Sequence, residues 1–140
     1  MRAAPLLAEI EALLLTVLPK NRVHVGHVPD TLPMDATYNV LPYVFLFSGL
    51  GADLPLERDL SRQADPLVRD LSPQVNCVGP TAHHALMLAD DIYAALINQR
   101  VGNHWLKPDA DAMRTQAALP DEQVSPTRFF MPLSWRLTTT

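Results

Sequence analysis

The most regular hydrophobic pattern in the chain lies between residues 82 and 96, where apolar side chains recur at spacings of three and four. This period lines one face of an α-helix. The side chains predicted to face the core are Ala82, Ala85, Leu86, Ala89, Ile92, Tyr93 and Leu96. Those predicted to face solvent are His83, His84, Asp90, Asp91 and Asn98.

The sequence on either side of this helix marks where it begins and ends. Gly79 breaks the preceding strand, Pro80 suits a first helical turn, and the Thr81 hydroxyl can cap free backbone amides. Arg100 places a cation near the negative end of the helix dipole, and Gly102 offers a left-handed cap. Small alanines on the buried face predict close packing against a sheet.

The remaining elements are a second helix and four strands. Apolar residues at helical spacing predict an amphipathic helix over residues 4–18, which Pro19 ends. Alternating or continuous apolar residues predict strands at residues 22–28, 41–48, 67–78 and 128–138. The second of these strands contains no charge, which is typical of a strand covered on both faces or lying at a subunit contact.

Glycine and proline positions predict irregularities in these strands. Gly26 favours a kink or bulge in the first strand, Pro73 an edge or a bend in the third, and Pro132 a turn or bulge in the last. Residues 49–66 and 101–123 lack a sustained period, so both are predicted to be long connections.

The order of helix, strands, helix and strand predicts an α+β fold. One small mixed or antiparallel sheet of about four strands would be covered by two helices. A length of 140 residues fits a single domain, residues 1–140. A domain of this size buries about two-thirds of its unfolded surface, so no metal or disulfide staple is required.

Composition narrows the classes of function. The formal net charge is −4, whereas a general nucleic-acid binder usually carries a basic surface. No segment is long enough to span a bilayer, and no cleavage site follows the apolar run at residues 13–18, so we expect neither membrane insertion nor secretion. The single cysteine, Cys77, lies in an apolar alternation and is predicted to be a buried, inert thiol.

The histidines and carboxylates show no spacing typical of a metal or catalytic site. His83 and His84 are adjacent, so on a helix they point about 100° apart. His24 and His27 do not complete any of the strong zinc spacings. The sequence also contains no glycine-rich phosphate loop and no nucleophile elbow. We therefore expect no bound metal, no cofactor and no enzymatic activity.

Four stretches follow the N-terminal helix in a characteristic order: VHVGHVPDTLP, LPYVFLF, VNCVGPTAHHALMLADDIYAALI and TRFFMPLSWRL. In this order they resemble the tail terminator proteins of long-tailed (siphovirus) phages, also called minor tail or tail-completion proteins, particularly those of actinobacterial phages. The resemblance covers nearly the whole chain. Its most specific part is a strand followed by Thr81, Ala82, Ala85, Leu88, Ala89 and Asp90.

The resemblance implies a structural virion protein that forms a hexameric ring at the head-proximal end of the tail tube. The ring would end tube polymerisation and provide the head-tail joining surface. The implied partners are further copies of the chain, the tail tube protein and the head-tail connector, or neck, protein, while DNA passes through the ring without its sequence being recognised. The implied location is the head-proximal end of the virion tail, and during assembly the protein is in the host cytoplasm. The family carries no catalytic residues.

The long connections offer segments for contacts between subunits, because a ring is built from heterologous contacts. The interface candidates in the first connection are Leu50, Asp53, Leu54, Leu56, Glu57, Asp59 and Leu60. The leucines would dock against another subunit, and acidic residues lining a pore would repel DNA phosphates. The alternative is an ordinary solvent-exposed loop.

Two other functions fit the same sequence. A head-tail connector of the same virion neck would share the ring but bind the portal side. A small intracellular enzyme or ligand-binding domain of ferredoxin-like shape would instead contain a deep pocket with perturbed titratable groups. The mass in solution separates this last function from the ring, and the position in an assembled particle separates the two virion functions.

Overall fold

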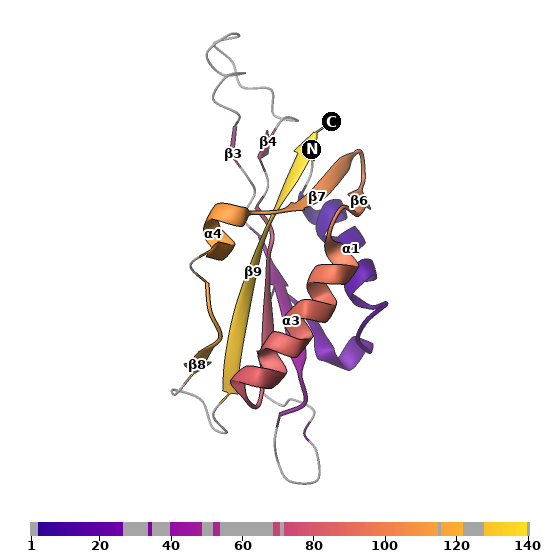
Figure 1. Ribbon diagram of the computed structural model, residues 1–140. Helices are drawn as coiled ribbons and strands as arrows, with labels where there is room; N and C mark the ends of the chain where they lie inside the picture. Colours follow the sequence, from indigo (N-terminus) through magenta and orange to yellow (C-terminus); the bar gives the residue numbers. More distant parts are fainter. Residues whose placement is uncertain are drawn as a thin grey trace.

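A strand of twelve residues, β9 (Arg128–Thr139), pairs with other strands along both of its edges (Figure 1). The structure is a computed structural model, and it describes residues 3–26, 34, 40–48, 52–53, 69–70, 72–114, 116–121 and 128–139. These residues form three α-helices and a curled, mixed sheet of seven strands. The predicted α+β class is confirmed, and two of the helices cover the sheet as predicted, but the sheet has seven strands rather than about four.

Six strands of the sheet follow the order β1, β2, β5, β9, β7, β6, and β8 pairs with β9 off this path. β1 is parallel to β2, and the other pairs of the sheet are antiparallel. The strand bounds are β1 Val23–Val25, β2 Tyr43–Phe47, β5 Gln74–Gly79, β6 Arg100–Val101, β7 His104–Pro108 and β8 Leu119–Asp121. A separate two-stranded ladder joins β3 (Ala52–Asp53) to β4 (Arg69–Asp70).

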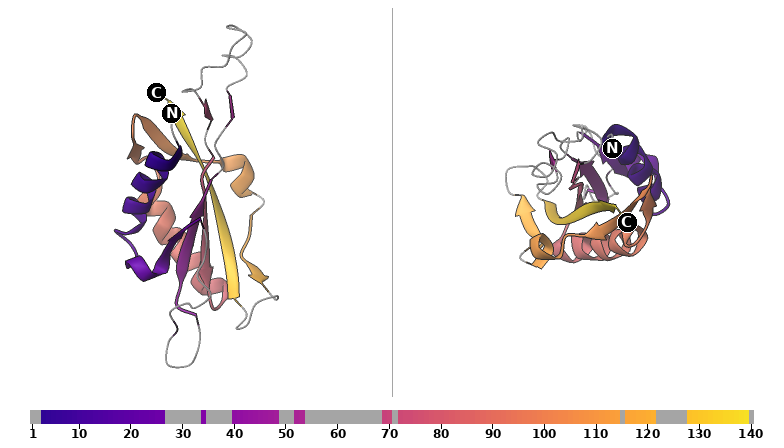
Figure 2. Two further views of the ribbon diagram at one scale, coloured as in Figure 1. Left: turned by 180° about the vertical axis from the view of Figure 1, so that it is seen from behind. Right: turned by 90° about the horizontal axis from the view of Figure 1, so that it is seen from above.

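Two helices cover one face of the sheet. α1 (Ala3–Leu14) packs against β1 and β2, and α3 (Ala82–Leu96) packs against β5 and β9. The two helices contact each other and lie on the same side of the strands (Figure 2). The short α4 (Ala110–Arg114) lies beside β9, and a 3-10 turn, Lys20–Arg22, leads into β1. The core between helices and sheet includes Leu6, Ile10, Leu14, Val44, Leu46, Val75, Cys77, Ile92, Leu133 and Trp135.

The start of α3 lies against the end of β5. The Thr81 side chain accepts a hydrogen bond from the backbone N–H of His84 at 3.2 Å, which confirms the predicted cap. A Cβ atom on Gly79 would lie 2.9 Å from the backbone nitrogen of Ala85 and 2.9 Å from the Cβ of His84. Any side chain there would clash, so glycine lets the helix fold back across the strand that precedes it.

The buried face of α3 differs from the predicted one. Its buried side chains are Ala85, Leu88, Ala89, Ile92 and Leu96. Leu86 is 45% exposed and Tyr93 is 36% exposed, so the prediction that both face the core is wrong. Both the predicted and the observed sets of residues have the spacing of three and four that lines one face of a helix. Contact with the sheet decides between them, and it buries Leu88 rather than Leu86. The solvent-facing side chains were predicted correctly: His83, His84, Asp90, Asp91 and Asn98 are all exposed.

The left-handed residue after α3 is Asn98 rather than the predicted Gly102. Asn98 has a φ of 59°, and its N–H donates to the carbonyl of Leu106 at 3.0 Å. Asparagine tolerates this conformation better than most non-glycine residues do. Gly102, with a φ of 61°, belongs instead to the turn between β6 and β7.

The prediction that residues 101–123 form a polar connection is also wrong. This part of the chain contains β7, α4 and β8, and β6 ends inside it. β7 pairs with residues 135–139 of β9, and β8 pairs with residues 128–130 along the same edge. Each of these elements is too short to show a hydrophobic period. The strands among them form by pairing with other strands, β6 with β7, and β7 and β8 with β9.

Pro132 lies within β9 without the predicted turn or bulge, in an uninterrupted register with β5. The N–H of Trp135 donates to Pro73 on the β5 side, whereas the carbonyl of Ser134 accepts from Asp109 on the other side. Because successive strand residues point their backbone groups to alternate edges, Pro132 faces the same way as Ser134. Its missing N–H therefore points to the gap between β7 and β8, where the described strands do not require a donor.

Several predicted boundaries move. α1 ends at Leu14, and residues 15–17 form a turn in place of the predicted last helical turn. The strand predicted at residues 67–78 is divided into β4 and β5, and β5 begins directly after Pro73 as a central strand rather than an edge. β1 is followed by Gly26 at a φ of 83°. The strands predicted around β2 and β9 are confirmed.

Replacement of a core residue of α3 should be far more damaging than replacement of an exposed one. Ile92→Ala should lower the free energy of unfolding by about 2–5 kcal/mol, because the side chain is fully buried. Leu86→Ala should change it by less than about 0.5 kcal/mol. Urea denaturation followed by circular dichroism measures both variants. A loss at Leu86 equal to or larger than the loss at Ile92 would contradict this orientation of α3.

Candidate functional site

The sheet has a second face, turned away from α1 and α3, which we call the open face (Figure 2). Alternate side chains of β2, β5 and β9 enter the core, and those between them lie on the open face. These side chains are Tyr43, Phe45, Phe47, Gln74, Asn76, Val78 and Phe130. Phe45, Phe47 and Phe130 are partly buried rather than buried, so aromatic surface remains accessible on this side.

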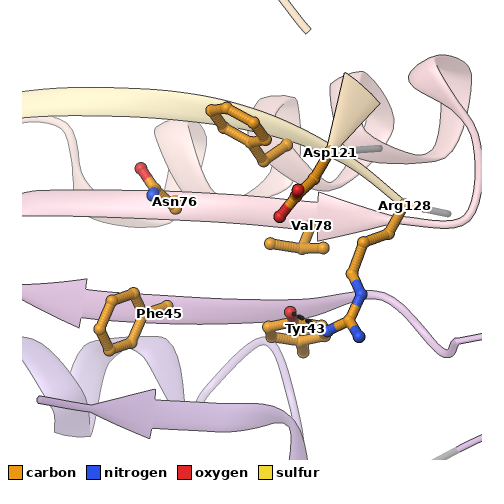
Figure 3. A pocket seen from close by; sticks show the side chains of 7 residues that line it. Tyr43, Phe45, Asn76, Val78, Asp121 and Arg128 are labelled. Atoms are coloured by element: carbon orange, nitrogen blue, oxygen red, sulfur yellow. Dashed lines mark hydrogen bonds between the residues drawn. The ribbon is translucent and has the colours of Figure 1, made fainter. Parts of the chain in front are cut away.

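A pocket of about 240 Å³ opens on this face (Figure 3). Side chains from β2, β5, β8 and β9 line it: Tyr43, Phe45, Asn76, Val78, Asp121, Arg128 and Phe130. The strand register pairs Tyr43 with Val78 and Val78 with Phe130, so these three side chains form one row across the sheet. The buried Val40 packs with these side chains in a small cluster separate from the main core.

The cation of the pocket, Arg128, is held by a tyrosine. The Nη1 atom of Arg128 donates to the hydroxyl of the buried Tyr43 at 3.0 Å. The Tyr43 ring packs edge-on against the ring of His24, with centroids 5.4 Å apart. Asp121 stands opposite Arg128 in the register of β8 and β9, so both charges lie at one end of the pocket (Figure 3).

Arg128 keeps unused donor capacity, since its Nε is buried and has no hydrogen-bond partner among the described atoms. A guanidinium offers five N–H donors in a planar fork that matches a carboxylate. The row of Tyr43, Val78 and Phe130 can contact an apolar group, and the guanidinium can bind an oxygen acceptor. Together they suit a ligand in which an apolar group lies close to such an acceptor.

The predicted interface residues fall mostly outside the described part of the chain. Asp53 is the exception, and its backbone lies in β3 opposite Arg69 of β4. This places one strand of a short ladder inside the predicted connection at residues 49–66, and the other strand follows that connection. The other candidates lie outside the described residues: Leu50, Leu54, Leu56, Glu57, Asp59 and Leu60.

The described histidines do not converge. The His83 and His84 rings are 6.3 Å apart, and the Nδ1 of His84 lies 2.7 Å from the Thr81 hydroxyl. His24 belongs to β1, and His27 lies outside the described residues. Within the described ranges, no three His, Cys, Asp or Glu side chains lie close enough to hold a metal ion.

Cys77 is buried as predicted. Its side chain is fully enclosed in the core, and desolvation by burial raises the pKa of the thiol far above its usual range. The thiolate needed for nucleophilic chemistry is therefore suppressed. No described helix is both long enough and apolar enough to cross a membrane.

Sequence reasoning missed most of the pocket. The uncharged β2 segment was the available signal, because it predicted either two covered faces or a subunit contact. Asp121 and Arg128 could not be paired in advance, since β8 itself was not predicted. The pocket joins four strands of one sheet, of which only β8 and β9 are close together in the sequence.

No protein family and no curated protein matches this sequence.

Removal of one hydroxyl tests the Arg128 contact. Tyr43→Phe should lower the free energy of unfolding by about 0.5–1.5 kcal/mol, because it removes a hydrogen bond while the buried ring is kept. Tyr93→Phe is the matched control, since this exposed ring packs on Trp135, and it should have little effect. Urea unfolding curves measure both. Indistinguishable curves for Tyr43→Phe and the unaltered chain would contradict the contribution of this bond.

Proposed function

We propose that this chain is a structural virion protein, a tail terminator whose copies form a hexameric ring at the head-proximal end of a phage tail tube. The ring ends tube polymerisation and offers the joining surface for the head-tail connector. DNA passes through it without sequence recognition. The protein acts in the virion, is assembled in the host cytoplasm, and has no catalytic role.

The observation that carries this proposal is the composition of β2. None of its five residues is charged, yet the helices cover one face of the sheet and leave Phe45 and Phe47 partly exposed on the other. An uncharged strand with one face open is typical of a sheet whose second face is covered by another protein. The sequence resemblance to tail terminators supplies the kind of assembly in which that partner is a further copy.

A second observation supports a ring rather than a symmetric dimer. α3 carries exposed apolar side chains, Leu86 and Met87, on the side that points away from the sheet. The open face and the outer surface of α3 thus lie on opposite sides of the protomer (Figure 2). Two different surfaces on opposite sides favour head-to-tail contacts, which close into rings when the rotation permits.

Two other functions are retained as alternatives. A head-tail connector of the same neck would use the same ring and differ in the side of the junction that it contacts. A ligand-binding domain is favoured by the pocket containing Arg128 and Asp121, and it would bind a small molecule as a monomer.

Mass and position test the proposal. Native mass spectrometry of the purified chain over a range of concentrations should show a species of six copies, and negative-stain electron microscopy should show rings. Antibody labelling of phage particles should then mark the head-tail junction on the tail side. A monomer at all concentrations together with unlabelled particles would contradict the proposal, and a label on the portal side would select the connector instead.

A further inference from the structure

We infer that the outer surface of α3 in one copy docks into the open-face pocket of the next copy. This inference rests on the proposed ring and specifies its contact: a side chain from the Leu86 and Met87 pair enters the pocket, and Asp90 or Asp91 reaches Arg128. The partner is therefore a second copy of this chain.

The outer surface of α3 presents an apolar side chain and a carboxylate in repeated order. Leu86 is followed four residues later by Asp90, and Met87 is followed four residues later by Asp91. Residues four apart on a helix lie one above the other, with Cβ atoms about 5–6 Å apart. Met87 is 53% exposed, and both aspartates are exposed. Each pair therefore offers a short apolar projection with an anion beside it.

The pocket presents the complementary pair. Phe45, Val78 and Phe130 supply apolar walls, and Arg128 supplies the cation (Figure 3). An incoming carboxylate would give the guanidinium an acceptor in addition to the Tyr43 hydroxyl, with charge-assisted geometry. A methionine or leucine side chain would cover the aromatic surface that the protomer leaves partly exposed.

The wider charge pattern agrees with this orientation. Lys107 and Arg136 are paired in the register of β7 and β9, and the strand alternation places them on the same side of β9 as Arg128. The described part of this side thus carries three cations, with Asp121 as the acidic member of the pocket. Among the described residues named here, these three cations outnumber Asp121, so charge attraction favours the acidic outer surface of α3 as the partner of this face and disfavours α3 against α3.

The contact is heterologous because its two halves lie on opposite sides of one protomer. α3 covers one side of the sheet, and the open face is the other side. Each copy can therefore accept α3 from one neighbour on its open face and offer its own α3 to the other neighbour. The two halves remain available at the ends of any open chain, and closure of a ring satisfies both.

Cysteine crosslinking tests the predicted juxtaposition. The native Cys77 is fully buried, so an introduced thiol reacts over a low background. The double variant Met87→Cys/Phe45→Cys should form a ladder of dimers, trimers and larger species under mild oxidation. An equal mixture of the two single variants should give dimers and no ladder. Leu15→Cys, at a position 40% exposed on another surface, is the control and should give no more than background.

Charge exchange tests the same contact without a covalent bond. Asp90→Arg/Asp91→Arg and, separately, Arg128→Glu should each raise the concentration needed for half-maximal ring formation by about tenfold or more. Combining the three substitutions should recover much of this loss. Asp111→Arg is the matched control, because Asp111 pairs with Arg114 on the exposed surface of α4, and it should leave assembly unchanged. Circular dichroism confirms that each variant is folded.

The outcomes separate this inference from the proposed function. Rings that form without the ladder, or without any recovery in the combined charge variant, would overturn the α3 contact and leave the tail terminator proposal standing. A chain that forms no rings under any condition overturns both.

Discussion

The close approach of α3 to the end of β5 is the constraint on which the rest of the structure depends. Gly79 allows the chain to reverse without a clash, and Thr81 caps the helix that follows. The helix then lies back over its own strand and over β9, with Ala85 and Ala89 at the contact. Small side chains let backbone layers approach closely, and Ile92 and Leu96 fill the remaining space. α1 completes the layer, which commits one face of the sheet to the core and leaves the other open.

β9 connects this arrangement to the second half of the chain by pairing with its strands. Its inner edge pairs with β5, while its outer edge is divided between β7 and β8. The interruption between these two strands is where α4 lies and where Pro132 points its missing donor. One residue that cannot donate a ladder hydrogen bond is therefore accommodated without bending the strand. The same division brings Asp121 on β8 beside Arg128 and so completes the pocket.

The sequence predicts the structural features that depend on neighbouring residues. It does not predict the features that depend on contacts with other segments of the chain. The α+β class, the cap at Thr81 and the burial of Cys77 follow from short-range pattern and chemistry. The orientation of α3 does not, because its apolar residues form a stripe wider than the surface that the sheet can cover. The strands between residues 100 and 121 also escape prediction, since each is short and forms by pairing with another strand: β6 with β7, and β7 and β8 with β9. The pocket requires the pairings of β2 with β5, β5 with β9 and β8 with β9 together, and among these strands only β2 gives a signal for it in the sequence.

The misassigned side chains are themselves informative about assembly. A single exposed leucine or methionine on a helix is common in monomeric proteins and needs no explanation. Leu86 and Met87, however, each stand one turn before an aspartate, while the opposite side of the protomer offers aromatic walls beside an arginine. Helical spacing assigned Leu86 to a core because its chemistry is that of an interior residue. In the proposed ring Leu86 is both exposed on its own protomer and buried in the assembly, because the interior that receives it is formed between two copies rather than within one.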